Sequence, residues 1–557
     1  MADQPTEPPT EPPASPAPPG TDSSKPVPMA KAALMLSVAT LVSRFLGLLR
    51  EQVFAALLGA GFYGDAFTMA FRLPNLLRDL FAEGALSAAF QPAFIELRKK
   101  SGPKAAFLLA NAVTTLLLIV VGTLVLLGVV FAPQLVDTWA TGYAQVAGKV
   151  ELTILLTRIM MPFLLLVSVA AVAMGMLNAE QRFVPPALAP ALFNLAAIVV
   201  GGCLWLLGIG QTRTAAIAWA AATMLGGVLQ LLAQWLPLFR SGYRPRLTSV
   251  LTHEGLRAVL WAMAPATIGL GATQLNIYIS SSFASQQNGA VTWLQVAFRL
   301  MQLPIGMFGV AVGTVALAQA AESASESDLR TALDGVRDTL RRGLRLSIFY
   351  TLPTAVALWV LSEPILRVIY QHGAFSAFDT EKAAAALRYY SLGLLCYSGI
   401  KVFAPVFYAL KRTRIPMLAS LLGVLCGVLW NIVLHRHYGY LALALGTTIT
   451  ASVNFAVLLV SFRRMYGELL REGDGKALLQ IALLSAVSGV AMSATVWAYK
   501  TATGASTLAT STAGGLALVA AALLIGGSLY VGLGRLAKLG EVQAVLAVLS
   551  RRLPRRG

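Results

Sequence analysis

The stretch Asp65–Leu86, DAFTMAFRLPNLLRDLFAEGAL, places charged residues inside an otherwise apolar segment. Arg72, Arg78, Asp79 and Glu83 fall within about three turns of the helix that the segment predicts. Charges inside an apolar helix need a partner or a polar cavity. The fold has to supply one of these.

The composition of the whole chain is that of a membrane protein. Of its 557 residues, 57% are hydrophobic and 12% are charged, and the mean hydropathy is +0.70. Soluble domains carry about 25% charged residues. The apolar runs are continuous and long enough to cross a bilayer, at about 20 residues each. They predict an all-α polytopic membrane protein and exclude a β-barrel, whose strands would alternate.

The apolar runs predict about fourteen transmembrane helices. Their expected bounds are 32–58, 65–97, 105–132, 147–177, 185–208, 213–237, 256–286, 290–320, 337–361, 382–410, 415–435, 439–462, 476–498 and 509–534.

The distribution of Lys and Arg predicts the orientation of these spans. Connections after even-numbered spans are basic, as at 98–104 and 463–464, whereas those after odd-numbered spans are nearly uncharged. Positive residues favour the cytoplasmic side, so both termini are expected in the cytoplasm. The formal charge of +18 is then a topology signal and an attraction to anionic lipid, and it does not indicate nucleic-acid binding.

The chain also contains an internal duplication. The tetrapeptide AFRL occupies 70–73 and again 297–300, a shift of 227 residues, and Arg182 aligns with Arg414 at a shift of 232. Both shifts equal six predicted spans. Six is an even number, so the two halves run in the same direction. Such a repeat is typical of transporters, whose substrate site lies between the halves.

The predicted architecture is therefore two parallel six-helix repeats around a central cavity, followed by two extra C-terminal helices. The expected parts are a disordered Pro-rich tail (1–28), an N-terminal lobe (29–240), a C-terminal lobe (241–465), the extra helix pair (466–535) and a basic amphipathic cytoplasmic tail on the membrane surface (536–557).

Several cationic residues lie deep in the predicted spans. Arg44 is about 19 Å into the first span and Arg78 roughly 20 Å into the second. Arg158, Arg299 and Lys401 have no acidic residue in the interior of their own spans, so Arg299 is expected to lack a nearby carboxylate. Arginine binds phosphate and carboxylate in a bidentate way. The pattern indicates an anion-binding cavity, with internal ion pairing as the alternative for the arginines of the first half.

Six blocks of the sequence closely resemble the MurJ (MviN) family of lipid II flippases in the MOP superfamily. They are SRFLGLLRE (43–51), GDAFTMAFRLPNLLRDLFAEGALSAAFQPAF (64–94), NAEQRFVPPALAP (178–190), AFRLMQLPIGMFGVAVGT (297–314), YQHGAFSAFDT (370–380) and KVFAPVFYALKRTRIP (401–416). The resemblance implies that the chain moves the undecaprenyl-diphosphate-linked peptidoglycan precursor from the cytoplasmic to the periplasmic leaflet of the bacterial inner membrane by alternating access.

The resemblance also implies a substrate site. The arginines that the family requires in its central cavity correspond to Arg44, Arg50, Arg78 and Arg299. Supporting cavity residues are expected at Glu51, Asp65, Asn75, Glu83 and Lys401. The resemblance places a groove for the lipid tail along the last two spans, and candidate bend points for the movement are Pro74, Pro304, Gly306 and Gly309.

Such a transporter breaks no bond, and the four histidines show no metal-binding spacing, so we expect no enzyme activity, metal or cofactor. The energy source stays open between Na⁺ and the membrane potential. Polar span residues could hold Na⁺ or bond between helices: Gln274, Asn276, Asn431, Thr448 and Asn454. Expected partners are lipid II, membrane lipids and cell-wall synthesis or division proteins. The alternatives are a flippase for another polyprenyl-diphosphate glycan, of the O-antigen type, and a non-transporting cell-wall scaffold.

Overall fold

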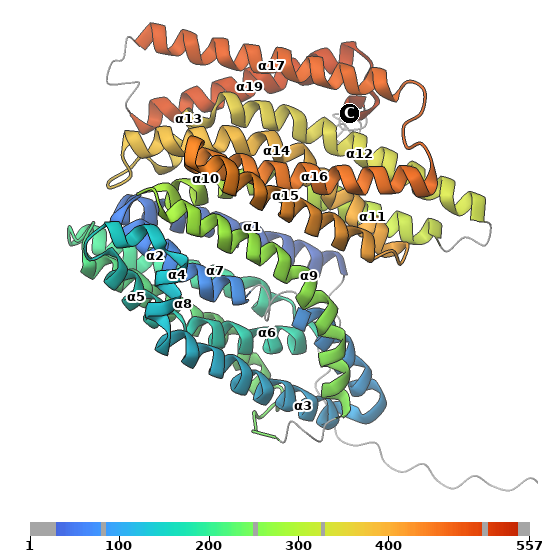
Figure 1. Ribbon diagram of the computed structural model, residues 1–557. Helices are drawn as coiled ribbons and strands as arrows, with labels where there is room; N and C mark the ends of the chain where they lie inside the picture. The colour runs from blue at the N-terminus through green and yellow to red at the C-terminus, as the bar shows by residue number, and fades with distance from the viewer. Residues whose placement is uncertain (1–28, 79–84, 249–253, 325–328, 504–510, 544–557) are drawn as a thin grey trace, which may run out of the picture.

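Helices make up the regular structure of the chain (Figure 1). The computed structural model describes residues 29–78, 85–248, 254–324, 329–503 and 511–543, and no strand occurs among them. Eleven candidate membrane spans are found in these residues. The predicted all-α polytopic fold is confirmed. The tail at 1–28 and Glu83 lie outside the described residues.

The first lobe is built from α1 to α8. Its elements are α1 (Met29–Leu58), α2 (Phe62–Arg78), α3 (Ala85–Val130), α4 (Ala132–Trp139), the short 3₁₀ helix η2 (Thr141–Gln145), α5 (Lys149–Met160), α6 (Phe163–Ala179), α7 (Val184–Leu206) and α8 (Arg213–Arg240). Helix α3 contains the end of the second predicted span and nearly all of the third, up to Val130. The two parts meet at a kink at Gly102, whose φ of 83° is a conformation that glycine adopts readily.

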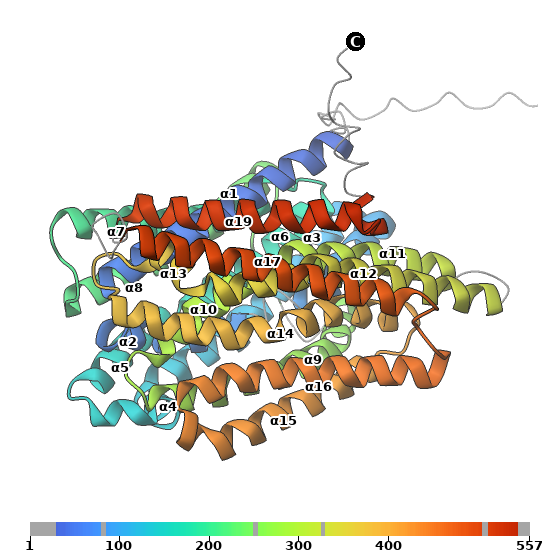
Figure 2. The same ribbon diagram turned by 90° about the horizontal axis from the view of Figure 1, so that it is seen from above.

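The second lobe repeats this arrangement and adds a helix pair. Its elements are α9 (Glu254–Ser285), α10 (Ala290–Pro304), the π-helical turn η3 (Ile305–Gly309), α11 (Val310–Ala324), α12 (Leu329–Val360), α13 (Ser362–Tyr370), α14 (Ala377–Ala409), α15 (Arg414–Tyr438) and α16 (Tyr440–Tyr466), then α17 (Asp474–Thr503) and α19 (Thr512–Leu536). Figure 1 shows α1 and α9 between the two lobes. Helices α17 and α19 run side by side on the outer face of the second lobe, against α12 and α13 (Figure 2).

The duplication is visible in elements that sequence reasoning did not predict. The short helices α4 and α13 each begin after a residue of nearly the same conformation. These residues are Phe131, with φ −90° and ψ 17°, and Leu361, with φ −95° and ψ 11°. They stand 230 positions apart (361 − 131). The two lobes are therefore copies of one chain path.

The turns before α7 and α15 fix the register of the two copies. Gln181 and Lys411, again 230 positions apart (411 − 181), have positive φ values of 60° and 57°. The next residues, Arg182 and Arg412, each donate a backbone N–H to the carbonyl five residues earlier. This shared turn pairs Arg182 with Arg412, so the predicted alignment of Arg182 with Arg414 is wrong by two residues.

Pro304 interrupts the eighth predicted span. Proline has no N–H and cannot bond to the carbonyl four residues back. The chain passes through the π-helical turn η3 before α11 continues. The irregularity expected near Pro304, Gly306 and Gly309 is therefore present, and it begins about one turn after Arg299.

The residues that follow α19 fold back onto the second lobe. Leu539 and Val542 are only 3% and 1% exposed and pack in a cluster with side chains of α12, α17 and α19. Glu541 forms an ion pair of 2.6 Å with Arg345 of α12. These residues of the tail therefore pack on the protein, and the expectation that the tail lies on the membrane surface stays a prediction. Residues 544–557 lie outside the described ones.

Ending the chain after Lys538 should lower its unfolding temperature, whereas ending it after Gln543 should leave the temperature unchanged. The first truncation removes Leu539, Glu541 and Val542, and burial of the two apolar side chains contributes about 3 kcal/mol. Thermal unfolding of both purified proteins checks this. Equal unfolding temperatures for the two truncations would contradict it.

Candidate functional site

The two lobes touch at the end of the bundle where α1 ends and α10 begins, which we call the closed end. Ala374, in the connection before α14, donates its N–H to the carbonyl of Ala56 in α1, at 2.8 Å. Gly142 donates its N–H to Ser285 at the end of α9. A Cβ on Gly59 would lie 2.6 Å from the carbonyl oxygen of Ala374. The backbones are thus too close there for any residue but glycine.

Asp65 of α2 is the centre of the closed end. Its carboxylate is fully buried. It accepts the N–H groups of Gly289 (2.6 Å) and Thr292 (3.0 Å) and the Thr292 hydroxyl (2.7 Å). Lys149 of α5 donates from Nζ at 3.1 Å. Asp65 therefore caps the N-terminus of α10 across the lobe boundary, where a negative charge is favoured.

Lys149 is as buried as its partner. Its Nζ also donates to Asn288 at 2.8 Å and lies 4.1 Å from the ring centroid of Tyr143. Burial and the nearby Asp65 raise the pKa of Tyr143 well above its ordinary value, so the phenol stays protonated and donates to the Asp65 carbonyl. Sequence reasoning missed Lys149. The sequence feature that could have indicated it is a lysine at the start of a predicted span, on the side where the connections carry few basic residues.

Asp65 thus belongs to the closed end and not to the cavity in which we expected it. Arg72, on the same helix, donates to Ser281 of α9 and not to Asp65. Both residues connect α2 to the second half of the chain.

Further from the closed end, Glu51 of α1 lies between two arginines. Its Oε1 is 3.0 Å from Nη2 of Arg299 in α10, and it also pairs with Arg50. The expectation that Arg299 lacks a nearby carboxylate is wrong. The partner comes from the other lobe, which the spacing within one span cannot reveal. The side chain of Arg299 is 50% exposed, whereas that of Glu51 is 9% exposed.

The remaining predicted arginines lie around this trio. Arg78 and Arg299 are close enough to Arg50 for their charges to act on it. Arg44 is exposed, and its Nη1 lies 3.3 Å from the position that a Cβ on Gly306 would take. Helices α1, α2 and α10 therefore bring guanidinium groups from both lobes together, with two of them open to a ligand.

The ring of Phe193 in α7 packs against the guanidinium group of Arg50. The Cζ atom of Arg50 lies 5.3 Å from the ring centroid of Phe193, within the range of a cation–π contact. The Phe163 ring packs at 5.5 Å on Phe193, and a Cβ on Gly226 would come within 2.7 Å of the Phe193 ring. Phe193 carries no charge and stands in an apolar run, so no sequence signal marks it.

The other predicted residues are more dispersed. Asn75 is half-buried on α2, and Lys401 is exposed on α14. Three of the candidate Na⁺ residues bond between helices. Asn431 donates to Ser280 (3.3 Å), Asn454 to Ser420 (3.1 Å) and Thr448 to the Tyr389 carbonyl (2.8 Å). No group of three His, Cys, Asp or Glu residues that could hold a metal occurs among the residues with described positions.

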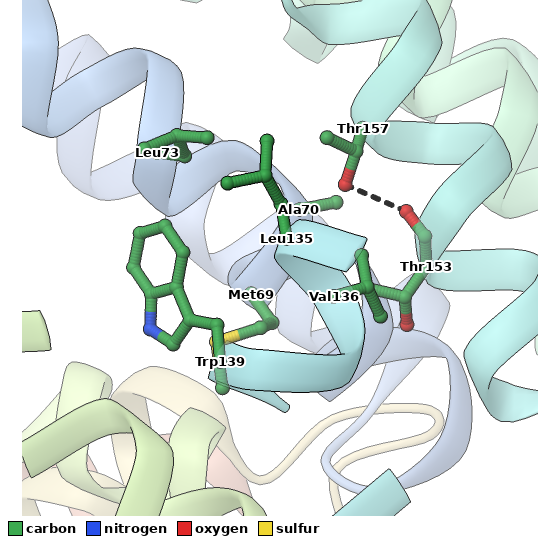
Figure 3. Close-up of a pocket in the computed structure, with 8 residues that line it drawn as sticks. All are labelled: Met69, Ala70, Leu73, Leu135, Val136, Trp139, Thr153 and Thr157. Carbon is green, nitrogen blue, oxygen red and sulfur yellow. Dashed lines mark hydrogen bonds between the residues drawn. The ribbon is translucent and has the colours of Figure 1, made fainter. Parts of the chain in front are cut away.

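A small pocket lies inside the first lobe between α2, α4 and α5 (Figure 3). The Thr157 hydroxyl donates to the Thr153 carbonyl there. The lining is otherwise apolar and contains no charged residue: Met69, Ala70, Leu73, Leu135, Val136, Trp139, Thr153 and Thr157. It does not suit an anionic substrate.

The fold defines a class, a polytopic membrane protein of the transporter type, with a cluster of arginines where its two lobes meet. The sequence profile described as "Lipid II flippase MurJ" matches residues 54–514. A "Probable lipid II flippase MurJ" of Bdellovibrio bacteriovorus is 34% identical over 476 residues, which is 84% of this chain and 88% of that protein. The chain belongs to the MurJ lipid II flippase family.

Solved structures show the same fold. "Lipid II flippase MurJ, inward closed conformation" matches with a TM-score of 0.73 at 24% identity, covering 90% of this chain and 99% of that chain. An inward-facing multidrug resistance MATE family transporter of the MOP superfamily matches with a TM-score of 0.64 at 16% identity, covering 79% and 98%. The resemblance drawn from the sequence blocks is confirmed.

Replacing Asp65 with Asn should destabilise the protein by about 3–5 kcal/mol, because Lys149 is left buried without a countercharge. The double variant Asp65→Asn/Lys149→Met should lose less, since neither charge remains. Thermal unfolding of the two single variants and the double variant checks this. If the double variant lost the sum of the two single losses, the ion pair would not be what stabilises the closed end.

Proposed function

We propose that this chain translocates lipid II across the bacterial inner membrane. The observation that carries the proposal is the trio of Arg50, Glu51 and Arg299, which joins the two lobes and leaves Arg299 half exposed. A diphosphate presents several oxygens to guanidinium forks, and such charge-assisted bonds are strong. Arg44, which is exposed on α1 and lies further from the closed end than Arg50, adds another guanidinium donor.

The lipid part of the substrate can stay in the bilayer during the movement. Only the diphosphate, the sugars and the peptide have to pass between the lobes. Helices α17 and α19 have no counterpart in the duplication, and they expose large apolar side chains such as Val490, Trp497 and Leu524. We propose that the undecaprenyl tail follows their surface while the closed end opens and the opposite end closes. The reaction breaks no bond, so we propose no catalytic activity.

In this proposal the closed end faces the periplasm and both termini are cytoplasmic. The basic connections support this orientation, because they lie at the opposite end of the bundle, beside the kink in α3 and the end of α16. In this orientation the contact between the lobes closes the periplasmic side, and the substrate is made on the opposite, cytoplasmic side.

A fluorescent protein that matures only in the cytoplasm should be bright when fused after Gly557, and alkaline phosphatase at the same place should be inactive. The same pair fused in the 208–212 connection should give the opposite result. Active phosphatase at the C-terminus would contradict the orientation.

For the energy source, we propose that the membrane potential contributes. The substrate headgroup is negative and leaves the negative side of the membrane, which is worth about 2.3 kcal/mol per charge at 100 mV. The interhelical bonds of Asn431, Asn454 and Thr448 support a structural role for these residues more than Na⁺ binding. We further propose cell-wall synthesis and division proteins as partners.

Arg299→Ala should accumulate to normal levels but fail to rescue cells depleted of their lipid II flippase. Glu51 keeps its contact with Arg50, so folding should survive, whereas a charged fork for the diphosphate is lost. We expect flipping to fall at least about tenfold, and Arg299→Lys to recover little because ammonium lacks the fork. Growth and the exposure of lipid II on the outer leaflet are the measurements.

The matched control is Arg213→Ala, an exposed arginine at the start of α8 away from the cluster, which should rescue fully. Normal growth with Arg299→Ala would show that the cluster does not bind the substrate. Failure of the unchanged chain to rescue, together with transfer of an O-antigen-type lipid, would favour the alternative glycan. Rescue of growth without any transfer of lipid by the purified chain would favour a non-transporting scaffold.

A further inference from the structure

Arg158 is a cation that the transport site does not use. It lies on α5, about 14 Å along the helix from Lys149 and within a candidate membrane span. Its side chain is exposed, and it takes part in no ion pair with any residue of the described ranges. An exposed arginine at this level of the bilayer is costly unless it meets a polar partner.

One of the five N–H donors of Arg158 has a fixed partner. Its Nε donates to the carbonyl of Val129 in the last turn of α3, at 3.2 Å. That carbonyl receives no helical hydrogen bond, because the residue four positions later is Pro133, which has no N–H. The bond anchors the guanidinium plane beside the end of α3 and leaves the two Nη groups for another acceptor.

The surface around this carbonyl is apolar and exposed. Val130 and Phe131, which follow it, are 56% and 49% exposed, and Leu126 is 63% exposed on the same helix. Helix α3 ends at Val130 and α4 follows toward the closed end, so this surface lies in the half of the span nearer the closed end. Thr157, the neighbour of Arg158, points into the first lobe and lines its small pocket. Arg158 therefore lies on the outside of the lobe, away from the arginine cluster.

We propose that Arg158 binds the phosphate of an anionic phospholipid in the leaflet at the closed end. The anchored guanidinium presents parallel donors to phosphate oxygens, and the apolar side chains around it contact the acyl chains. A dissolved anion would gain nothing from those apolar neighbours, so the surface favours a lipid headgroup over free phosphate. The lipid would cover a cation that otherwise stays exposed in the membrane.

Native mass spectrometry of the purified full chain tests the site. The protein is incubated with equal amounts of phosphatidylglycerol and phosphatidylcholine. The unchanged protein should retain about one more phosphatidylglycerol than Arg158→Gln, whose retention at this site should be on the order of tenfold weaker. Arg213→Gln, which removes an exposed arginine near the same end of the first lobe, should retain lipid like the unchanged protein.

Two further measurements keep the proposal falsifiable. Phosphatidylglycerol should raise the unfolding temperature of the unchanged protein and of Arg213→Gln, but not that of Arg158→Gln, and gel filtration verifies that each variant is folded. Arg158→Lys should bind more weakly than arginine because it lacks the Nε anchor. Equal lipid retention by Arg158→Gln and the unchanged protein would overturn the proposal, as would displacement of the lipid by millimolar inorganic phosphate.

Discussion

One buried carboxylate holds the two lobes together. Asp65 is removed from water, and its charge is balanced by the first N–H groups of α10 and by Lys149. Removing a carboxylate from water costs several kcal/mol, and this cost is offset only while its donors are in place. The donors come from both lobes, so the lobes cannot separate gradually at this point. Water or another donor has to reach Asp65 in the same step.

The arginine cluster depends on this contact. Helices α1 and α10 are both fixed at the closed end, and Arg50 and Arg299 lie about 12 Å and 14 Å along them from that end. Residues at similar depth then meet, which is why one carboxylate, Glu51, serves both arginines. Two guanidinium groups and one carboxylate leave the trio positive. A negative ligand between the lobes removes the remaining repulsion.

The sequence predicted how far along its span each charged residue lies, but not which residue it pairs with. Hydropathy and the AFRL repeat predicted the lobes, because the length of a span and the similarity between two segments can be read along the linear sequence. The ion pair of Arg299 with Glu51, the stacking of Phe193 under Arg50 and the burial of Lys149 depend on how helices rotate against one another. Spacing within a single helix carries no information on that rotation.

The two repeats share a backbone path, but their buried carboxylates are bonded differently. In the AFRL register (a shift of 227) position 65 of α2 corresponds to Thr292 of α10, next to Trp293, and Lys149 of α5 corresponds to Asp379 of α14 (a shift of 230). In the second lobe the Trp293 indole donates to Asp379 at 2.8 Å, and Ser376 completes the bonding of that carboxylate within the same lobe. The acid of the first lobe instead reaches across to α10. Separating the lobes therefore changes the bonding of Asp65 and leaves Asp379 as it is, so the cost of opening falls on one copy of the repeat while the other keeps its bonds.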